Sequence, residues 1–258
     1  MSVDQEIRLG DEAFDEARQP GGPAAKIISS GPQYERVQRV AGRVFEAANR
    51  RHPEIARRFD WRIVLVDDPK TVNAWALPGG DCAVYTGMLD VADTDDMLAA
   101  VLGHEAAHAI ARHGGERISQ GVVLELISNG MVLADLPPAA QQATMIALGL
   151  GSLSFSRDQE SEADELGLLI AADAGYDPHG AVELWKKMAA RGQSAPVEFL
   201  STHPSERTRI HRLEQLIPRA MKIYDARVRA TSSTSPPTHS ATEHSSVANR
   251  SSGDTGSS

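Results

Sequence analysis

The stretch Ala99–His113, which reads AAVLGHEAAHAIARH, constrains the fold of this chain more than any other part of the sequence. Its alanines favour a helix, and Val101 and Leu102 add apolar side chains, so the stretch predicts a largely apolar helix. His104, Glu105 and His108 are costly to bury in that helix unless a partner satisfies them, and a metal ion is one such partner. The stretch therefore predicts a metal site, or a helix in which the histidines occur by chance.

The spacing of the two histidines suits a single zinc ion. On an α-helix, four residues rise roughly 6 Å and bring both side chains to one face. Glu105 lies beside them, close enough to take a proton from a water molecule that zinc activates and to donate it to a leaving amine. This HExxH pattern supplies two ligands and a base, but a catalytic zinc site also needs a third protein ligand and an open position.

The candidate for the third ligand lies in residues 156–167, which read SRDQESEADELG. Glu160 and Asp164 are four residues apart and share a helix face. Glu160 can bind zinc through one oxygen, and Asp164 can accept the outer N–H of a ligand histidine and so fix its orientation. A solvated acidic face is the alternative interpretation, because runs of charge usually face water.

The rest of the chain predicts a mainly helical α+β fold with a small sheet. Residues 61–66 are a β-branched apolar run typical of a strand, and VNAWAL and CAVYTG, joined by the turn residues PGGD, predict a hairpin over residues 72–87. The helix that contains the HExxH pattern should run to about Arg112, with Gly114-Gly115 as its stop. Further helices are expected at 1–19, 32–51, 117–135, 138–153, 157–174, 178–191 and 204–228.

Composition limits the remaining organisation. With 258 residues and a net charge of −9, the chain can build one sizeable core and offers no broad surface for nucleic acid. The single cysteine, Cys82, rules out an intramolecular disulfide. Residues 1–229 are expected to form the catalytic domain, and the Ser/Thr-rich residues 230–258 a disordered tail because they have almost nothing to bury.

No targeting segment or membrane span is expected. The chain starts with polar residues, so it is predicted to be cytoplasmic if Met1 is the true start. The apolar stretches 121–136 and 143–155 are interpreted as buried or cleft-lining helices, since the first carries two acidic residues and the second is too short to span a bilayer. Peripheral membrane contact stays open.

Four motifs together give a specific resemblance. GHEAAH, SRDQESEADELG, AGYDP at 174–178 and THPSERTRI at 202–210 resemble, in their order, the zinc metallopeptidase family of the CAAX prenyl endopeptidases and HtpX. The resemblance covers about residues 1–217 and is closest to the soluble bacterial-envelope members. It implies a zincin-like catalytic domain with a small antiparallel sheet beside the HExxH helix, and a periplasmic or envelope location.

The resemblance also implies roles for single residues. His104, His108 and Glu160 would bind one zinc ion per chain, Glu105 would be the catalytic base, and Asp164 would brace a ligand from outside. All five residue types are intact in this sequence.

The fourth motif adds His203 and Arg209. The resemblance implies that His203 either stabilises the developing oxyanion or occupies the open zinc position in a latent form. The alternative is that His203 only precedes a helix that starts at a proline, while Arg209 makes a salt bridge. His113 has a weaker claim, because a histidine near a helix C-terminus is favourable without any other role.

The hairpin is the expected substrate-binding element. The resemblance puts an edge strand that contains Asn73, Ala74, Trp75 and Ala76 at the cleft, where a peptide could add to it through main-chain hydrogen bonds. The alternative is an ordinary hairpin whose Trp75 packs into the core, and Cys82 is expected to be a small buried residue of this hairpin.

The leading hypothesis is therefore a zinc metalloendopeptidase that acts on unfolded or misfolded polypeptides in protein quality control. A metal-bound chaperone or partner-binding protein with a latent site is the alternative, and a zinc hydrolase of small molecules is a third. The sequence gives no indication of the oligomeric state.

Overall fold

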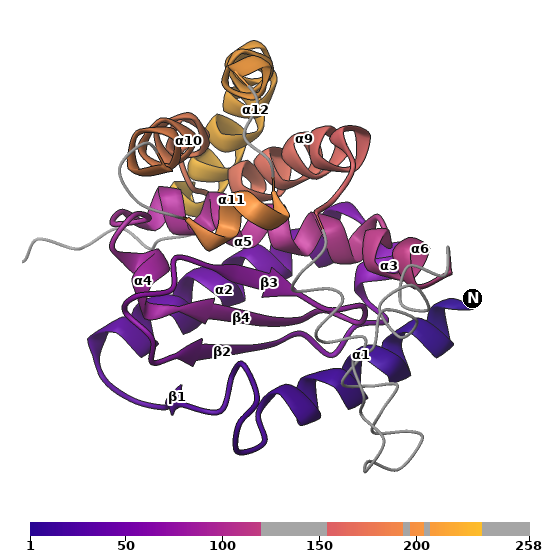
Figure 1. Ribbon diagram of the computed structural model, residues 1–258. Helices are drawn as coiled ribbons and strands as arrows, with labels where there is room; N and C mark the ends of the chain where they lie inside the picture. The colour runs from indigo at the N-terminus through magenta and orange to yellow at the C-terminus, as the bar shows by residue number, and fades with distance from the viewer. Residues whose placement is uncertain (120–153, 193–196, 204–206, 234–258) are drawn as a thin grey trace, which may run out of the picture.

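The computed structural model describes residues 1–119, 154–192, 197–203 and 207–233. In these residues a small sheet and the helix α5 (Asp95–Ile110) form successive layers, and α9 (Arg157–Asp173), α10 (His179–Gly192) and α12 (Arg207–Ser233) cover the side of α5 that faces away from the sheet (Figure 1). This is the mainly helical α+β architecture that the sequence predicts. The layering puts α5 at the centre of the molecule.

The sheet consists of β1 (Ile27–Ile28), β2 (Arg62–Val66), β3 (Ala74–Ala76) and β4 (Asp81–Tyr85), in the order β1-β2-β4-β3 among the described residues. β3 and β4 form the predicted antiparallel hairpin, but β4 runs parallel to β2. The expected purely antiparallel sheet is therefore wrong, and the sheet is mixed. The reason is that the chain reverses twice between β2 and β4, so β4 returns in the direction of β2 and inserts between β2 and β3.

The turn between β3 and β4 depends on glycine. Gly79 and Gly80 have φ angles of 97° and 93°, which side-chain-bearing residues rarely adopt. Because β4 pairs with both of its neighbours, β3 is left as an edge strand with one side unpaired in the described sheet. The predicted edge strand is thus present, and its free side faces α5.

Most of the predicted helices are present, with small differences at their ends. The helices expected at 1–19 and 32–51 correspond to α1 (Val3–Ala17) and α2 (Pro32–Arg51), and those expected at 157–174, 178–191 and 204–228 to α9, α10 and α12. The sequence analysis missed the short helices α3 (Pro53–Ala56), α4 (Thr86–Leu89) and α11 (Glu198–Thr202), as well as β1. The helices predicted at 117–135 and 138–153 lie almost wholly outside the described residues.

The end of α5 corrects one prediction. The helix starts at the N-cap Thr94, whose side chain accepts a hydrogen bond from the backbone of Met97, but it ends at Ile110 rather than at Arg112. Arg112 has a φ of 62°, and the next helix, α6 (His113–Ser119), already contains the glycines expected to be the stop. Gly115 instead permits a close approach, because a Cβ there would lie 2.2 Å from the carboxyl carbon of Glu6.

Helix α1 packs against the hairpin and against the end of α5. Phe14 of α1 packs edge-on against Trp75, with ring centroids 6.1 Å apart, so the Trp75 side chain contributes to packing as the alternative interpretation expected. Glu6 is buried and forms an ion pair with Arg112 directly after α5. Helix α1 is thereby tied both to the hairpin and to the end of the central helix.

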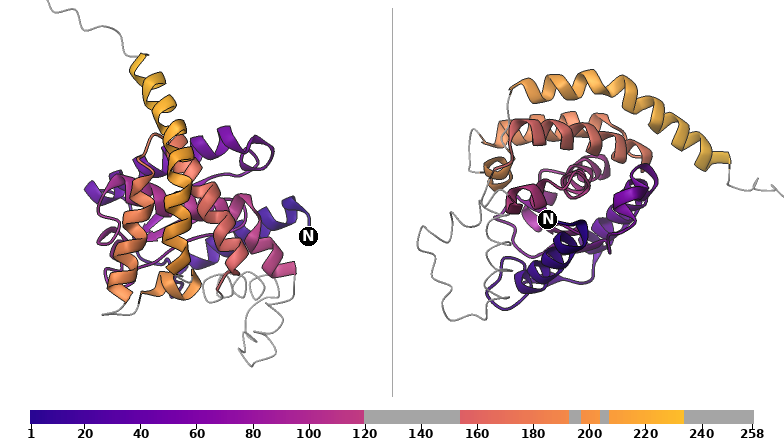
Figure 2. Two further views of the ribbon diagram at one scale, coloured as in Figure 1. Left: turned by 90° about the horizontal axis from the view of Figure 1, so that it is seen from above. Right: turned by 90° about the vertical axis from the view of Figure 1, so that its right-hand side faces the viewer.

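Two further expectations concern the C-terminal half and membranes. Helix α12 continues through Ser233, past the point at which the tail is expected, and its end projects from the body of the molecule (Figure 2). Residues 234–258 and nearly all of the two apolar stretches lie outside the described residues. No described helix combines the length and apolar character needed to cross a membrane.

Candidate metal centre

Helix α5 carries the first part of the site. His104 and His108 are both at most 4% exposed, and their Nε2 atoms lie 3.0 Å apart. One turn of helix separates them, so the backbone itself aims both rings to one point. Helix α5 is buried on all sides because the sheet and α9 cover it, which is what its apolar sequence predicts.

Helix α9 brings Glu160 to the two histidines. The helix begins at a capping box, in which the Ser156 side chain accepts a hydrogen bond from the Gln159 backbone, and Glu160 follows on its buried face. One Glu160 oxygen lies 3.3 Å from His108 Nε2 and the other 3.6 Å from His104 Nε2. The acidic run is therefore not a uniformly solvated face, since Glu160 and Asp164 are buried while Glu162 is exposed.

His203 joins the same cluster from the end of α11. Its Nδ1 lies 2.8 Å from Glu160 Oε1 and 3.1 Å from His104 Nε2, while its Nε2 lies 3.4 Å from Glu105 Oε1. His203 is 2% exposed, and its backbone N–H bonds to Phe199 of α11. The structure thus brings His203 close to the other donors, although it lies 99 positions from His104 in the sequence.

Arg209 and Asp164 support the cluster from outside. The Arg209 guanidinium donates to Glu160 and, at 2.6 Å, to Asp164, and its carbon lies 3.5 Å from the Trp185 ring centroid. Asp164 Oδ1 lies 3.1 Å from Nδ1 of His104, the nitrogen that faces away from the other donors. Each of the two carboxylates therefore has a buried cation beside it, which offsets the cost of burying them.

Burial decides the charge states in this region. It lowers the pKa of His104 and His108 well below their usual range, so both imidazoles are neutral, which is the form that binds metal ions. Burial, and then the charge of Glu160, raise the pKa of Glu105 well above its usual range. For Glu160 itself burial is opposed by contacts with the three histidines, and its pKa is lowered.

The donor set fits a metal ion. His104, His108, Glu160 and His203 each offer a ligand atom, and these four atoms lie within 4.8 Å of one another. A tetrahedral zinc site with bonds of about 2.0–2.1 Å requires ligand atoms about 3.3 Å apart. With Glu160 Oε1 as the ligand oxygen, the pairs measured above range from 2.8 to 3.3 Å. Imidazole nitrogens with one carboxylate oxygen are ligands that suit zinc.

A pocket joins this cluster to the edge strand. Asn73, Ala74, Trp75 and Ala76 line it together with Glu105, Phe155, Thr202 and His203, and it encloses about 270 Å³ including the part open to solvent. The Glu105 Oε1 atom is buried and accepts no hydrogen bond from the described residues. A buried carboxylate oxygen at the edge of a pocket is free to receive a proton from a bound molecule.

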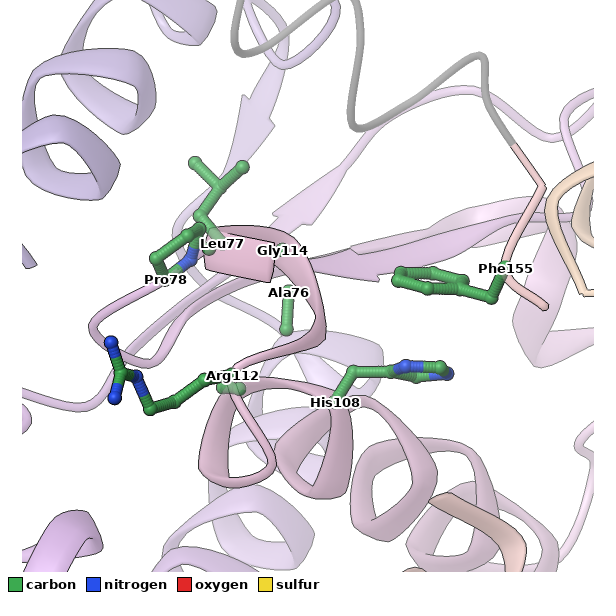
Figure 3. Close-up of a pocket in the computed structure, with 9 residues that line it drawn as sticks. Ala76, Leu77, Pro78, His108, Arg112, Gly114 and Phe155 are labelled. Atoms are coloured by element: carbon green, nitrogen blue, oxygen red, sulfur yellow. The ribbon is translucent and has the colours of Figure 1, made fainter. Parts of the chain in front are cut away.

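Phe155 divides the region in front of the cluster. A second pocket of about 230 Å³ lies beyond it, lined by Ala76, Pro78, His108 and Arg112 among others (Figure 3). Phe155 and Ala76 line both pockets, and the Phe155 ring stacks on His108 with centroids 3.8 Å apart. The sequence analysis did not single out Phe155, although this residue ends the stretch 143–155 that was interpreted as a buried or cleft-lining helix; Phe155 itself is not helical.

The sequence of this chain is similar to several known proteins. It is 35% identical over 223 residues to "Mitochondrial metalloendopeptidase OMA1" of Schizosaccharomyces pombe, with 85% of this chain and 63% of the relative covered. It is 34% identical over 212 residues to human "Metalloendopeptidase OMA1, mitochondrial", with 76% and 40% covered. It is 28% identical over 221 residues to "Beta-barrel assembly-enhancing protease" of Yersinia pestis, with 81% and 43% covered.

These relatives are longer than this chain, which spans between 40% and 63% of their length. They include mitochondrial proteins, so the similarity extends beyond the bacterial-envelope members that the motifs resemble. A family match is also found: residues 32–217, well over half of the chain, match peptidase family M48. The matched region contains all four donors, the buried Glu105 and both supporting residues, so this chain belongs to peptidase family M48.

Proposed function

We propose that this protein is a zinc-dependent endopeptidase that hydrolyses unfolded or misfolded polypeptides. The observation that carries the proposal is the position of Glu105, a buried carboxyl group that lies between a four-donor cluster and an unpaired strand edge. A base beside a metal site and a surface for an extended peptide are together what peptide hydrolysis requires. The names of the relatives, which include metalloendopeptidases and a protease, support the same activity.

In this proposal His104, His108 and Glu160 hold one zinc ion per chain. A bound zinc ion supplies Lewis-acid chemistry, which polarises a scissile carbonyl and makes water a nucleophile at neutral pH. Glu105 takes the proton of the attacking water and later gives it to the leaving amine. Burial raises the pKa of Glu105, which makes its carboxylate a stronger base towards the proton of that water.

The edge strand β3 would hold the substrate. An extended peptide that pairs with the backbone of residues 73–76 forms main-chain hydrogen bonds whatever its side chains are. Glu105 lines the same pocket as these residues, so the bound backbone would pass the base. Recognition of this kind requires an extended segment, which favours unfolded over folded polypeptides as substrates.

His203 and Arg209 have different roles in the proposal. Arg209 orients Glu160 and Asp164, because its guanidinium reaches both carboxylates. His203 contributes the fourth donor of the cluster, which supports the latent form, in which it occupies the position that a substrate needs. When His203 moves away, its ring would be free to stabilise an oxyanion instead.

The domain, location and biological role follow as further parts of the proposal. We expect residues 1–229 to form one catalytic domain, because the core connects elements from α2 to α12. One relative is named for enhancing β-barrel assembly, which supports a bacterial-envelope location and a role in protein quality control. The four-donor cluster also favours a second candidate, a metal-bound chaperone with a latent site, since a fully ligated ion leaves no position for substrate.

The test compares wild type with Glu105→Gln and with Glu46→Gln, an exposed glutamate of α2 that serves as the matched control. We expect all three proteins to bind one zinc ion, and only Glu105→Gln to lose casein cleavage, by at least about 100-fold. Cleavage by Glu105→Gln at the wild-type rate would refute the proposed mechanism. The chaperone would be supported instead if the wild type binds zinc without cleaving casein and if His203→Ala, in which the cluster is open, cleaves nothing either.

A further inference from the structure

His113 is a buried histidine that the proposed function leaves without a role. The φ of 62° at Arg112 turns the chain back at the end of α5, so that α6 starts with His113 beside the last turn of the central helix. His113 is 2% exposed although it is the first residue of α6. A polar ring that is buried this completely needs hydrogen-bond partners.

Its partners form a chain of hydrogen bonds that ends at the cluster. His113 Nδ1 lies 2.9 Å from His108 Nδ1, and His113 Nε2 lies 3.3 Å from the carboxylate of Glu162 on α9. His108 in turn presents its other nitrogen, Nε2, to His104 and Glu160. Glu162 is 59% exposed, so this chain runs from solvent to the donor set.

Only one arrangement of protons satisfies every member of this chain when His108 binds a metal through Nε2. The Nε2 atom must then be unprotonated, so the proton of the neutral ring is on Nδ1. That N–H donates to His113 Nδ1, which is unprotonated and accepts. The proton of His113 is therefore on Nε2, where it donates to the Glu162 carboxylate.

We propose that His113 is a positioning residue that fixes the tautomer and ring orientation of His108, and that Glu162 fixes His113 in the same way. This inference rests on the proposed function, because it takes His108 as a metal ligand. The other ligand histidine has an equivalent partner, since Nδ1 of His104 lies 3.1 Å from Asp164. Both α5 histidines thus have their outer nitrogen occupied, one by a carboxylate and one by an imidazole.

His113 does not act as a ligand itself in this arrangement. Its contact is with Nδ1 of His108, on the side of the ring that faces away from the other donors, and it is not among the four clustered residues. A role in packing alone is the competing explanation, and it makes a different prediction. An apolar side chain of similar size would then replace His113 without loss, whereas a positioning role requires a hydrogen-bond acceptor at the place of Nδ1.

The experiment measures zinc affinity by competition with a chromophoric chelator for wild type, His113→Leu, His113→Asn and Glu162→Gln. The matched control is His179→Ala, which removes an exposed histidine of α10. Loss of a partner to a ligand histidine typically lowers metal affinity about 10–100-fold, and we expect that loss for His113→Leu. His113→Asn should restore most of the affinity because its side-chain oxygen can accept at the place of Nδ1, and Glu162→Gln should lie between the two.

A second readout is the tautomer of His108, measured from the nitrogen chemical shifts of the folded protein. We expect the Nδ1–H form in wild type and His113→Asn, and a mixture of tautomers in His113→Leu. Equal zinc affinity and equal tautomer populations in wild type and His113→Leu would overturn the inference and leave the proposed function intact. Failure of wild type to bind zinc would instead remove the proposed function on which the inference rests.

Discussion

The crossing of α5 and α9 sets the distances between the residues of the candidate site. The substitution Gly103→Ala, which adds one methyl group at the crossing, tests this. Gly103 and Gly167 face each other where these helices cross. A Cβ at Gly103 would lie 2.6 Å from the Gly167 carbonyl oxygen, and one at Gly167 would lie 2.7 Å from backbone atoms at Gly103 and His104. Because both obstacles are backbone, no side chain can rotate away to make room.

The cost of Gly103→Ala follows from these distances. Ordinary contact requires about 3.5 Å, so the helices must move apart by about 0.9 Å to accommodate a Cβ that would otherwise lie 2.6 Å from the Gly167 oxygen. Overpacking of this kind costs about 1–3 kcal/mol, and the better helix propensity of alanine returns about 0.5–1 kcal/mol. The expected net loss in the free energy of unfolding is about 1 kcal/mol, within limits of about 0–2.5 kcal/mol.

The same movement separates the proposed zinc ligands, because His104 follows Gly103 directly and Glu160 lies on α9 two turns before Gly167. Ligand distances in metal sites are held to about 0.2 Å, so we expect zinc affinity to fall about 10–100-fold. This loss would add to the loss of stability, since the metal stabilises only the folded state.

The assay is urea unfolding followed by circular dichroism, together with chelator competition for zinc. Gly42→Ala is the matched control, because a Cβ at Gly42 of α2 meets nothing within 4 Å, and we expect it to stabilise the protein by about 0.5–1 kcal/mol. If Gly103→Ala is as stable as Gly42→Ala and binds zinc as wild type does, then the helix crossing does not set the site geometry.

Two further predictions concern a buried acid and the pocket wall. Burial raises the pKa of Asp81 from 3.8 to about 6, so the unfolded chain loses this proton first and folding stability falls as the pH rises from about 4 to 6. This rise in pKa corresponds to about 3 kcal/mol. Between pH 4 and pH 7 the free energy of unfolding of Asp81→Asn should therefore increase by about that much relative to wild type. A difference between the two proteins that does not change with pH would contradict this. Phe155→Ala should join the two pockets that Phe155 separates and shift cleavage towards peptides with bulkier side chains. Mass spectrometry of a digested peptide library measures this shift. An unchanged cleavage profile would show that Phe155 does not limit the size of the bound side chain.

The sequence determined the local elements and the residue types of the site. Proline and glycine mark the ends of α2 and the hairpin turn, and the apolar residues around the HExxH pattern predicted a helix that the structure shows to be buried on all sides. These signals are local, because capping, turn geometry and helix periodicity depend on residues a few positions apart. The same spacing placed His104 and His108 on one helix face before the fold was known.

The tertiary structure decided where those residues lie relative to one another. Glu160 and Glu162 belong to one acidic run, and the sequence singled out Glu160 only by its spacing from Asp164 and by the family resemblance. Packing against α5 is what buries the face of α9 that carries Glu160 and leaves Glu162 exposed. His203 comes to the cluster from a segment 99 positions from His104, and no periodicity relates positions that far apart. His113 is five positions from His108, but the turn at Arg112, and not helix periodicity, brings it beside that ring. The parallel pairing of β2 with β4 and the glycine contact between α5 and α9 likewise depend on long-range packing, which a pattern within one segment does not contain.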